Sequence, residues 1–157
     1  MSKPRKAFYQ LLKILFTFAF TGGVYLLLES LWRGYTFLEM YYLAGFLGLI
    51  TLAINEFFLE YDNEFLLQVL FCTVIGTLAE GICGYLYNYD YHIWDYRKLP
   101  GTFFNGQCNI FFAFAWFLVF FFLIPILDYI DWKVFKYKED TPPYYVFFGK
   151  KVFQFKD

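Results

Sequence analysis

The sequence predicts an all-α integral membrane protein built as a bundle of about four transmembrane helices. Hydrophobic residues make up 60% and aromatic residues 27% of the 157 residues, while charged residues make up 17%, against about 25% in an ordinary soluble domain. The apolar residues gather in four long segments, and a helix needs about 20 of them to cross a bilayer. The net charge is −1, whereas a nucleic-acid-binding protein usually carries an excess of basic residues, so we expect no nucleic-acid partner.

The first predicted span covers about residues 8–32. It is interrupted by Lys13, whose long side chain we expect to reach toward the near interface. Three- and four-residue steps place Gly22, Tyr25, Glu29 and Arg33 on one helical face. Glu29 and Arg33 are four residues apart and can form an ion pair, which either belongs to a polar site or simply ends the helix. The segment has no small-residue cleavage pattern, so we expect it to remain as a span and not to be a signal peptide.

The second predicted span covers about residues 37–58 and carries a stripe of small residues. The stripe consists of Gly45, Gly48, Leu52 and Asn55, and acidic residues lie near both ends, at Glu39 and Glu56. Small residues let helix backbones approach closely in lipid, so the stripe predicts an internal packing face. A short acidic turn, residues 60–64, leads to the third segment.

The third predicted span covers about residues 65–88 and contains a buried acid. Four-residue steps form a ridge of Cys72, Gly76, Glu80, Gly84 and Asn88. Glu80 lies about 12 Å along the helix before Asn88, too deep to reach bulk water easily. An ionisable residue inside a span costs about 2.5–3.5 kcal/mol on insertion scales, which makes Glu80 a candidate functional residue that faces other helices.

The fourth predicted span covers about residues 103–130, with Pro125 in its last third, where a membrane helix tolerates proline. We expect one face of this span to lie beside Glu80, and we expect two aspartates to mark the exit from the membrane. The face consists of Asn105, Asn109, Phe112 and Trp116, and the aspartates are Asp128 and Asp131.

The chain then divides into a transmembrane domain, residues 1–132, and a basic aromatic tail, residues 133–157, which we expect to be cytoplasmic or interfacial. The tail forms either a hairpin around Gly149 or short amphipathic pieces. Lysines and arginines flank the first span and follow the fourth, so the positive-inside rule predicts that both termini are cytoplasmic. These residues are Lys3, Arg5, Lys6, Lys13, Lys133, Lys136, Lys138, Lys150, Lys151 and Lys156.

This topology gathers the unusual polar residues in the outer half of the membrane. The predicted site consists of Glu29, Arg33, Glu80, Asn88, Trp94, Asp95, Asn105 and Gln107. We interpret it as a polar pocket, either open outward or capped by the loop around Trp94, in which Glu80 is paired with Arg33 or held protonated. The same residues also fit a purely structural clasp between helices, typically worth about 0.6 kcal/mol per hydrogen bond.

Catalysis is a third possibility for these residues. Glu29 with Glu80 is the one carboxylate pair that the topology brings together, and the sole histidine, His92, is expected to be an exposed loop residue. Glu29, Glu80 and Asp95 offer hard oxygen ligands, but their spacing does not demand a metal. We therefore predict no catalytic residue, cofactor or metal, and we expect Cys72, Cys83 and Cys108 to be free thiols.

Several of these motifs together resemble those of a known family. They are Glu-Ser-Leu-Trp-Arg-Gly at 29–34, Glu80 with Gly84, Trp-Asp-Tyr at 94–96, Pro100, and Phe-Asn-Gly-Gln-Cys at 104–108 with Trp116. The chain resembles the type IV ABC-transporter permease family of Firmicutes, the CmpB-like family, over about residues 22–131. The resemblance implies a small multi-pass protein of the bacterial cytoplasmic membrane with about four spans.

A transport role follows from the resemblance and from the buried carboxylate. The chain has no GxxxxGK[ST] loop, so any ATP hydrolysis would need a separate ATPase. A chain this short would work as a homo-oligomer or with other membrane subunits. We therefore predict a membrane transport component for a small solute or ion. An assembly subunit of a membrane complex and an intramembrane enzyme acting on a lipid-linked substrate are the alternatives.

Overall fold

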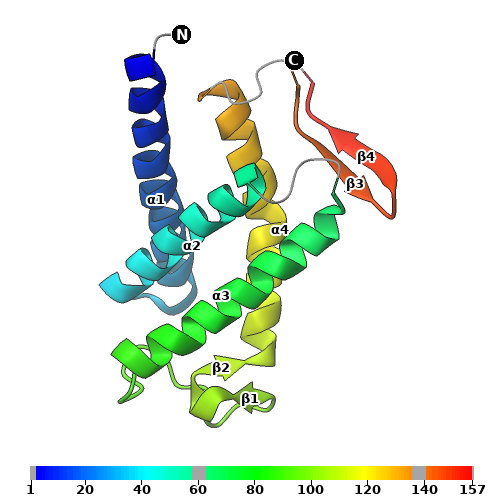
Figure 1. Cartoon of the computed structure of the whole chain (residues 1–157). Coiled ribbons are helices and arrows are strands. Elements are labelled where there is room, and N and C mark those ends of the chain that lie inside the picture. The colour runs from blue at the N-terminus through cyan, green and yellow to red at the C-terminus, as the bar shows by residue number, and fades with distance from the viewer. Residues whose placement is uncertain (1–2, 58–62, 136–140, 157) are drawn as a thin grey trace.

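Four long helices form the body of the chain (Figure 1). The computed structural model describes residues 3–57, 63–135 and 141–156. The helices are α1 (Lys3–Arg33), α2 (Leu38–Phe57), α3 (Phe65–Tyr87) and α4 (Ile110–Lys133). Each of these described helices is long and apolar enough to cross a membrane, which confirms the prediction of a multi-pass helical membrane protein.

The start of α1 and the end of the last strand lie at the same end of the bundle (Figure 1). An even number of spans requires this arrangement, while the side that faces the cytoplasm stays a prediction. Part of the predicted topology signal lies outside the described residues, namely Glu60, Asp62, Lys136, Lys138 and the side chains of Lys3, Arg5 and Lys6.

The fourth helix begins at Ile110, so the prediction of a span from about residue 103 was wrong. The preceding residues form β1 (Thr102–Phe103), the 3-10 turn η1 (Phe104–Gly106) and β2 (Cys108–Asn109). The φ angles of Phe104, Asn105 and Gly106 are 47°, 51° and 87°, a left-handed backbone that cannot continue a right-handed helix. The helix instead starts where the Asn109 side chain accepts a 2.9 Å hydrogen bond from the Phe111 amide.

Helices α1 and α2 pack closely because small residues of α2 face side chains of α1. A Cβ atom placed at Gly45 would lie 2.7 Å from the Phe18 ring, and one placed at Gly48 would lie 2.2 Å from the Thr21 hydroxyl. The predicted glycine stripe is therefore an internal packing face, as small residues in membrane helices commonly are.

Helices α3 and α4 form the second close pair. The α3 ridge predicted from the sequence is buried along its length, and its Gly76 accommodates the ring of Phe120, with 2.8 Å between a built Cβ and the nearest ring carbon. The opposite faces of the helices carry many large exposed apolar side chains, including Leu31, Leu86 and Phe122. Such outward apolar faces suit a lipid environment, because apolar side chains gain nothing by turning inward there.

The tail forms a β-hairpin, which decides between the two conformations left open by its sequence. Strands β3 (Tyr144–Phe147) and β4 (Lys150–Gln154) pair antiparallel, with Phe147 opposite Lys150. The two turn residues, Phe148 and Gly149, have φ angles of 50° and 71°, as a tight two-residue hairpin turn requires. Tyr145 packs its ring 4.9 Å from that of Phe65 and so fixes the hairpin to the start of α3.

Candidate functional site

Glu80 is buried in the bundle, with a residue exposure of 3%, and both of its oxygens accept hydrogen bonds. The Tyr96 hydroxyl donates to Oε1 at 3.0 Å, and the Trp116 indole donates to Oε2 at 3.4 Å. Glu80 is therefore held by the loop and by α4, and not by Arg33 as one of our two hypotheses had it. The carboxyl group ties three separate segments of the chain together.

The two donors to Glu80 are themselves held by aromatic stacking. Tyr96 stacks on Phe112 with ring centroids 4.4 Å apart, and Trp116 stacks on Tyr25 of α1 at 5.7 Å. Burial raises the pKa of the Tyr96 phenol, and the nearby Glu80 raises it further, so the hydroxyl stays a donor. Tyr25 lies close enough to Glu29 and Glu80 for both carboxyl groups to act on its phenol.

Arg33 and Glu29 form the ion pair that their i, i+4 spacing predicts, with 2.9 Å between Nη2 and Oε1. The Thr36 hydroxyl donates to the other Glu29 oxygen. Arg33 also donates to the Ile93 carbonyl at 2.9 Å and lies over the Tyr35 ring. The pair thus joins the end of α1 to the loop that follows α3.

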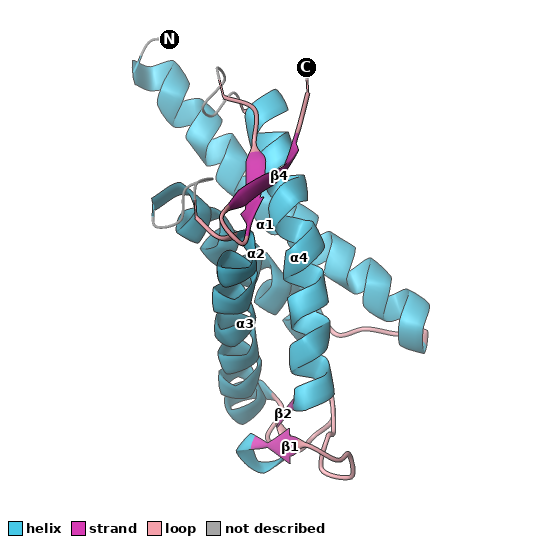
Figure 2. Ribbon diagram, turned by 90° about the vertical axis from the view of Figure 1, so that its right-hand side faces the viewer, coloured by secondary structure: helices cyan, strands magenta, loops and turns pink. Residues whose placement is uncertain are grey.

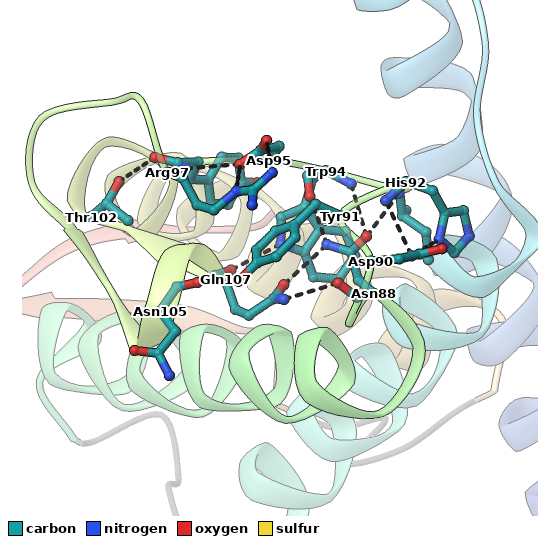
Figure 3. A network of polar contacts seen from close by, with 12 residues as sticks. Asn88, Asp90, Tyr91, His92, Trp94, Asp95, Arg97, Thr102, Asn105 and Gln107 are labelled. Carbon is teal, nitrogen blue, oxygen red and sulfur yellow. Dashed lines mark hydrogen bonds and ion pairs between the residues drawn. The ribbon is translucent and has the colours of Figure 1, made fainter.

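Asn88 is the centre of a buried network in that loop (Figure 3). Its amide donates to the Trp94 carbonyl at 2.7 Å and to Gln107 Oε1 at 3.0 Å, and its Oδ1 accepts from the Ile93 and Trp94 amides at 2.8 and 3.3 Å. Gln107 returns a 2.9 Å hydrogen bond to the Asn88 carbonyl, and its own carbonyl accepts from the Trp94 indole at 2.9 Å. Asn88 and Gln107 therefore shape the loop and do not line the pocket predicted for them.

Asp95 and Asn105 lie at the surface. The prediction that they belong to a polar pocket around Glu80 was therefore wrong. Asp95 accepts two hydrogen bonds from the Arg97 guanidinium, which lower the pKa of its carboxyl group to about 2. Arg97 in turn lies 3.8 Å from the centre of the Tyr91 ring. The Asn105 side chain points away from the network in Figure 3, because its positive φ turns it outward.

A cavity of about 470 Å³ lies between α1, α2 and α4, open on one side, and we call it the α1–α4 cavity. Its walls are largely apolar and aromatic. The polar side chains among the lining residues include the ion-paired Glu29 and Arg33. In the view of Figure 2, α1 diverges from α4 toward its own C-terminal end. Of the predicted site residues, Glu29, Arg33 and Trp94 line this cavity, while Glu80 lies behind two residues that do.

A second polar group, at the end of the bundle where α1 begins, was not recognised from the sequence. Lys13 is buried with a residue exposure of 2% and binds Glu56 and Asp131, so the prediction that it reaches the interface was wrong. Asp128 and Asp131 are buried in the protein as well, and the exit from the membrane at these residues stays a prediction. The sequence does show four charged residues inside the apolar segments. It does not show that they pair with one another.

The remaining candidates for chemistry lie apart from one another. His92 is in the loop, with a side-chain exposure of 47%, and is paired with Asp90. Among residues 3–57, 63–135 and 141–156, no three His, Cys, Asp or Glu side chains are grouped to hold a metal. The three cysteines are free, and burial, aided by Glu80, raises the pKa of the Cys108 thiol to about 12.

Comparison of the chain with models of protein families, with curated proteins and with solved structures finds no match. The class of the protein therefore follows from its four apolar helices, which define a multi-pass membrane protein. Its function has to be argued from the site.

Proposed function

We propose that the chain is a membrane transport component that binds an amphipathic small molecule in the α1–α4 cavity. The resemblance to a permease family suggests transport, and the cavity is the observation that carries the proposal. Its volume of about 470 Å³ lies in the range of about 300–1,000 Å³ that is usual for small-molecule sites.

The lining of the cavity indicates the chemical class of the molecule. Val24, Leu47 and Phe120 belong to largely apolar walls, which suit a ligand with an extended apolar part. The polar part of the lining comes from tyrosine side chains and from the Glu29–Arg33 ion pair.

The two charged residues that line the cavity, Glu29 and Arg33, form an ion pair, so their net charge is zero. A ligand with a net charge would leave one charge without a partner in a poorly hydrated place, which is costly. We therefore propose a ligand whose polar part is uncharged or zwitterionic. Entry through the open side between α1 and α4 would let the ligand come directly from the bilayer.

The chain would work within a larger assembly. The sequence contains no GxxxxGK[ST] loop, so an ATP-driven process would require a separate ATPase subunit. The proposed location is the bacterial cytoplasmic membrane with both termini in the cytoplasm, and other copies or other membrane subunits would complete the path.

The proposal is tested by native mass spectrometry of the protein extracted gently from its own membrane. Ala115 lines the cavity from α4, whereas Ala19 is exposed on α1 and does not line it. The wild type and A19F should carry a defined amphipathic molecule, and A115F should lose it because the new ring occupies the cavity. Retention of the molecule by A115F, or a wild-type bundle that carries only a partner subunit, would overturn the cavity as a ligand site.

The transport step needs its own measurement. The molecule identified in this way is loaded into proteoliposomes that contain the protein with its copurifying partners, and its release or transbilayer movement is followed for the wild type and A115F. Flux that depends on Ala115 supports transport. Binding without any flux by the complete complex would reduce the protein to a binding or assembly subunit.

A further inference from the structure

Six side chains meet inside the bundle at the end opposite the loop network. They come from four elements: Lys13 of α1, Asn55 and Glu56 of α2, Asp128 and Asp131 of α4, and Tyr145 of β3. We call this group the Lys13 cluster. It is distinct from the α1–α4 cavity, which none of these residues lines.

The Lys13 ammonium is the cation of the cluster. It lies 2.6 Å from Asp131 Oδ2 and also donates to Glu56, and the side chains of these three residues are 3%, 9% and 13% exposed. Asp128 is held differently, since Asn55 donates to its Oδ1 and the Tyr145 hydroxyl donates to its Oδ2 at 2.7 Å.

The charges of the cluster do not balance when all of its groups are ionised. Three carboxyl groups face one ammonium group, and Asp131 and Asp128 lie close enough to repel each other. Among the described residues, the charged groups that lie close enough to act on Asp131 are Lys13, Glu56 and Asp128. An unpaired carboxylate is costly in a buried place, so an excess of negative charge calls for a positive ligand.

Asp131 supplies a second and independent observation. Its side chain is 91% buried, and its Oδ2 binds Lys13. Its other oxygen, Oδ1, is also buried but accepts no hydrogen bond from any described residue. A buried carboxylate oxygen without a donor loses its hydration without compensation. A proton on Oδ1 neutralises one of the excess negative charges of the cluster and replaces the charged acceptor by a neutral hydroxyl group.

We propose that the Lys13 cluster is a proton-binding site that holds one proton on the carboxyl group of Asp131. A metal ion fits less well, because both Asp128 oxygens already accept hydrogen bonds from Asn55 and Tyr145. The described residues also contain no group of three acidic, histidine or cysteine side chains arranged for a metal. Because Tyr145 belongs to β3, the cluster is in direct contact with the β-hairpin of the tail.

The proposal is tested by infrared difference spectroscopy of the full chain in lipid nanodiscs, between neutral and alkaline pH. The wild type should show the C=O stretching band of a protonated carboxyl group at neutral pH and lose it when the pH is raised. Asp131→Asn should lack the band intensity of one carboxyl group, while Glu39→Gln, at an exposed residue of α2, should keep it. An unchanged band in D131N, or no such band in the wild type, would overturn the proposal.

A labelling measurement covers the case in which D131N does not fold. Labelling aspartate carboxyl carbons with ¹³C should shift the band in the wild type and also in Asp128→Asn. A band that moves only on glutamate labelling, or that is lost in D128N, contradicts a proton on Asp131. Thermal unfolding in sodium and in choline salts tests the competing ligand. If the melting temperature rises with sodium and does not depend on pH, the cluster binds a monovalent cation and not a proton, and the proposal is wrong.

Discussion

Replacement of Asn88 by aspartate tests whether the buried loop network holds this end of the bundle. Asn88 is completely buried, and its amide nitrogen donates to the Trp94 carbonyl and to Gln107 Oε1. Aspartate has the same shape but cannot donate from that position when ionised, so it turns two attractive contacts into contacts between acceptors. The substitution leaves no cavity, and its effect therefore reports on the lost hydrogen bonds and on the new buried charge, and not on packing.

The expected loss follows from the two donated hydrogen bonds. Each is worth about 1 kcal/mol net, and a buried acceptor left without a donor costs about 1–3 kcal/mol. We expect Asn88→Asp to destabilise the fold by about 3 kcal/mol or more, which lowers the melting temperature by roughly 6–12 °C for a chain of this size. Thermal unfolding in nanodiscs is followed by tryptophan fluorescence, because Trp94 lies in the network.

Asn105→Asp is the matched control, since it makes the same chemical change in the same loop. The Asn105 side chain is exposed, and its positive φ is one that aspartate also adopts readily. The stability of this variant should stay within about 0.5 kcal/mol of the wild type. If the two variants melt within about 2 °C of each other, the network does not stabilise the loop and our reasoning fails.

Three further predictions concern other parts of the molecule. Gly48→Ala should cost about 1–3 kcal/mol in thermal unfolding by overpacking α1 against α2, while Gly23→Ala, with open space around it, should cost nothing; equal effects would refute the close approach. Carbon NMR of labelled aspartate should place the pKa of Asp95 near 2, so its ion pair with Arg97 is present above about pH 4 and lost toward pH 2. In Arg97→Gln the pKa should return toward 3.8, and an unchanged pKa would contradict the ion pair. Tyr145→Phe removes a hydrogen bond to a carboxylate and should increase hydrogen exchange in β3 and β4, and unchanged protection would show that the hairpin is held by packing alone.

Much of the helical frame could be predicted from the sequence because it depends on local periodicity. Four-residue steps identified the buried ridge of α3, and the same rule paired Glu29 with Arg33. The glycine stripe of α2 was recognised for a physical reason that needs no partner sequence: small residues permit close backbone approach.

The contacts of the site could not be predicted because they depend on residues distant in sequence. Lys13 pairs with Asp131, 118 residues away, and no periodicity signals such a pair. Asn105 and Gln107 belong to one short motif, yet one is exposed and the other buried, because a left-handed turn separates them. A helical wheel extended through this turn placed Asn105 on the wrong side.

The structure also separates two roles that the sequence combined in Glu80. Its carboxyl group is buried and accepts hydrogen bonds from Tyr96 and Trp116, so its direct effect is to join α3, the loop and α4. Those same two donors line the α1–α4 cavity, and the position of the cavity wall therefore depends on a residue that does not itself line it. The clasp and the ligand site are thus not competing interpretations of one carboxylate: the clasp fixes the aromatic wall on which a ligand would lie.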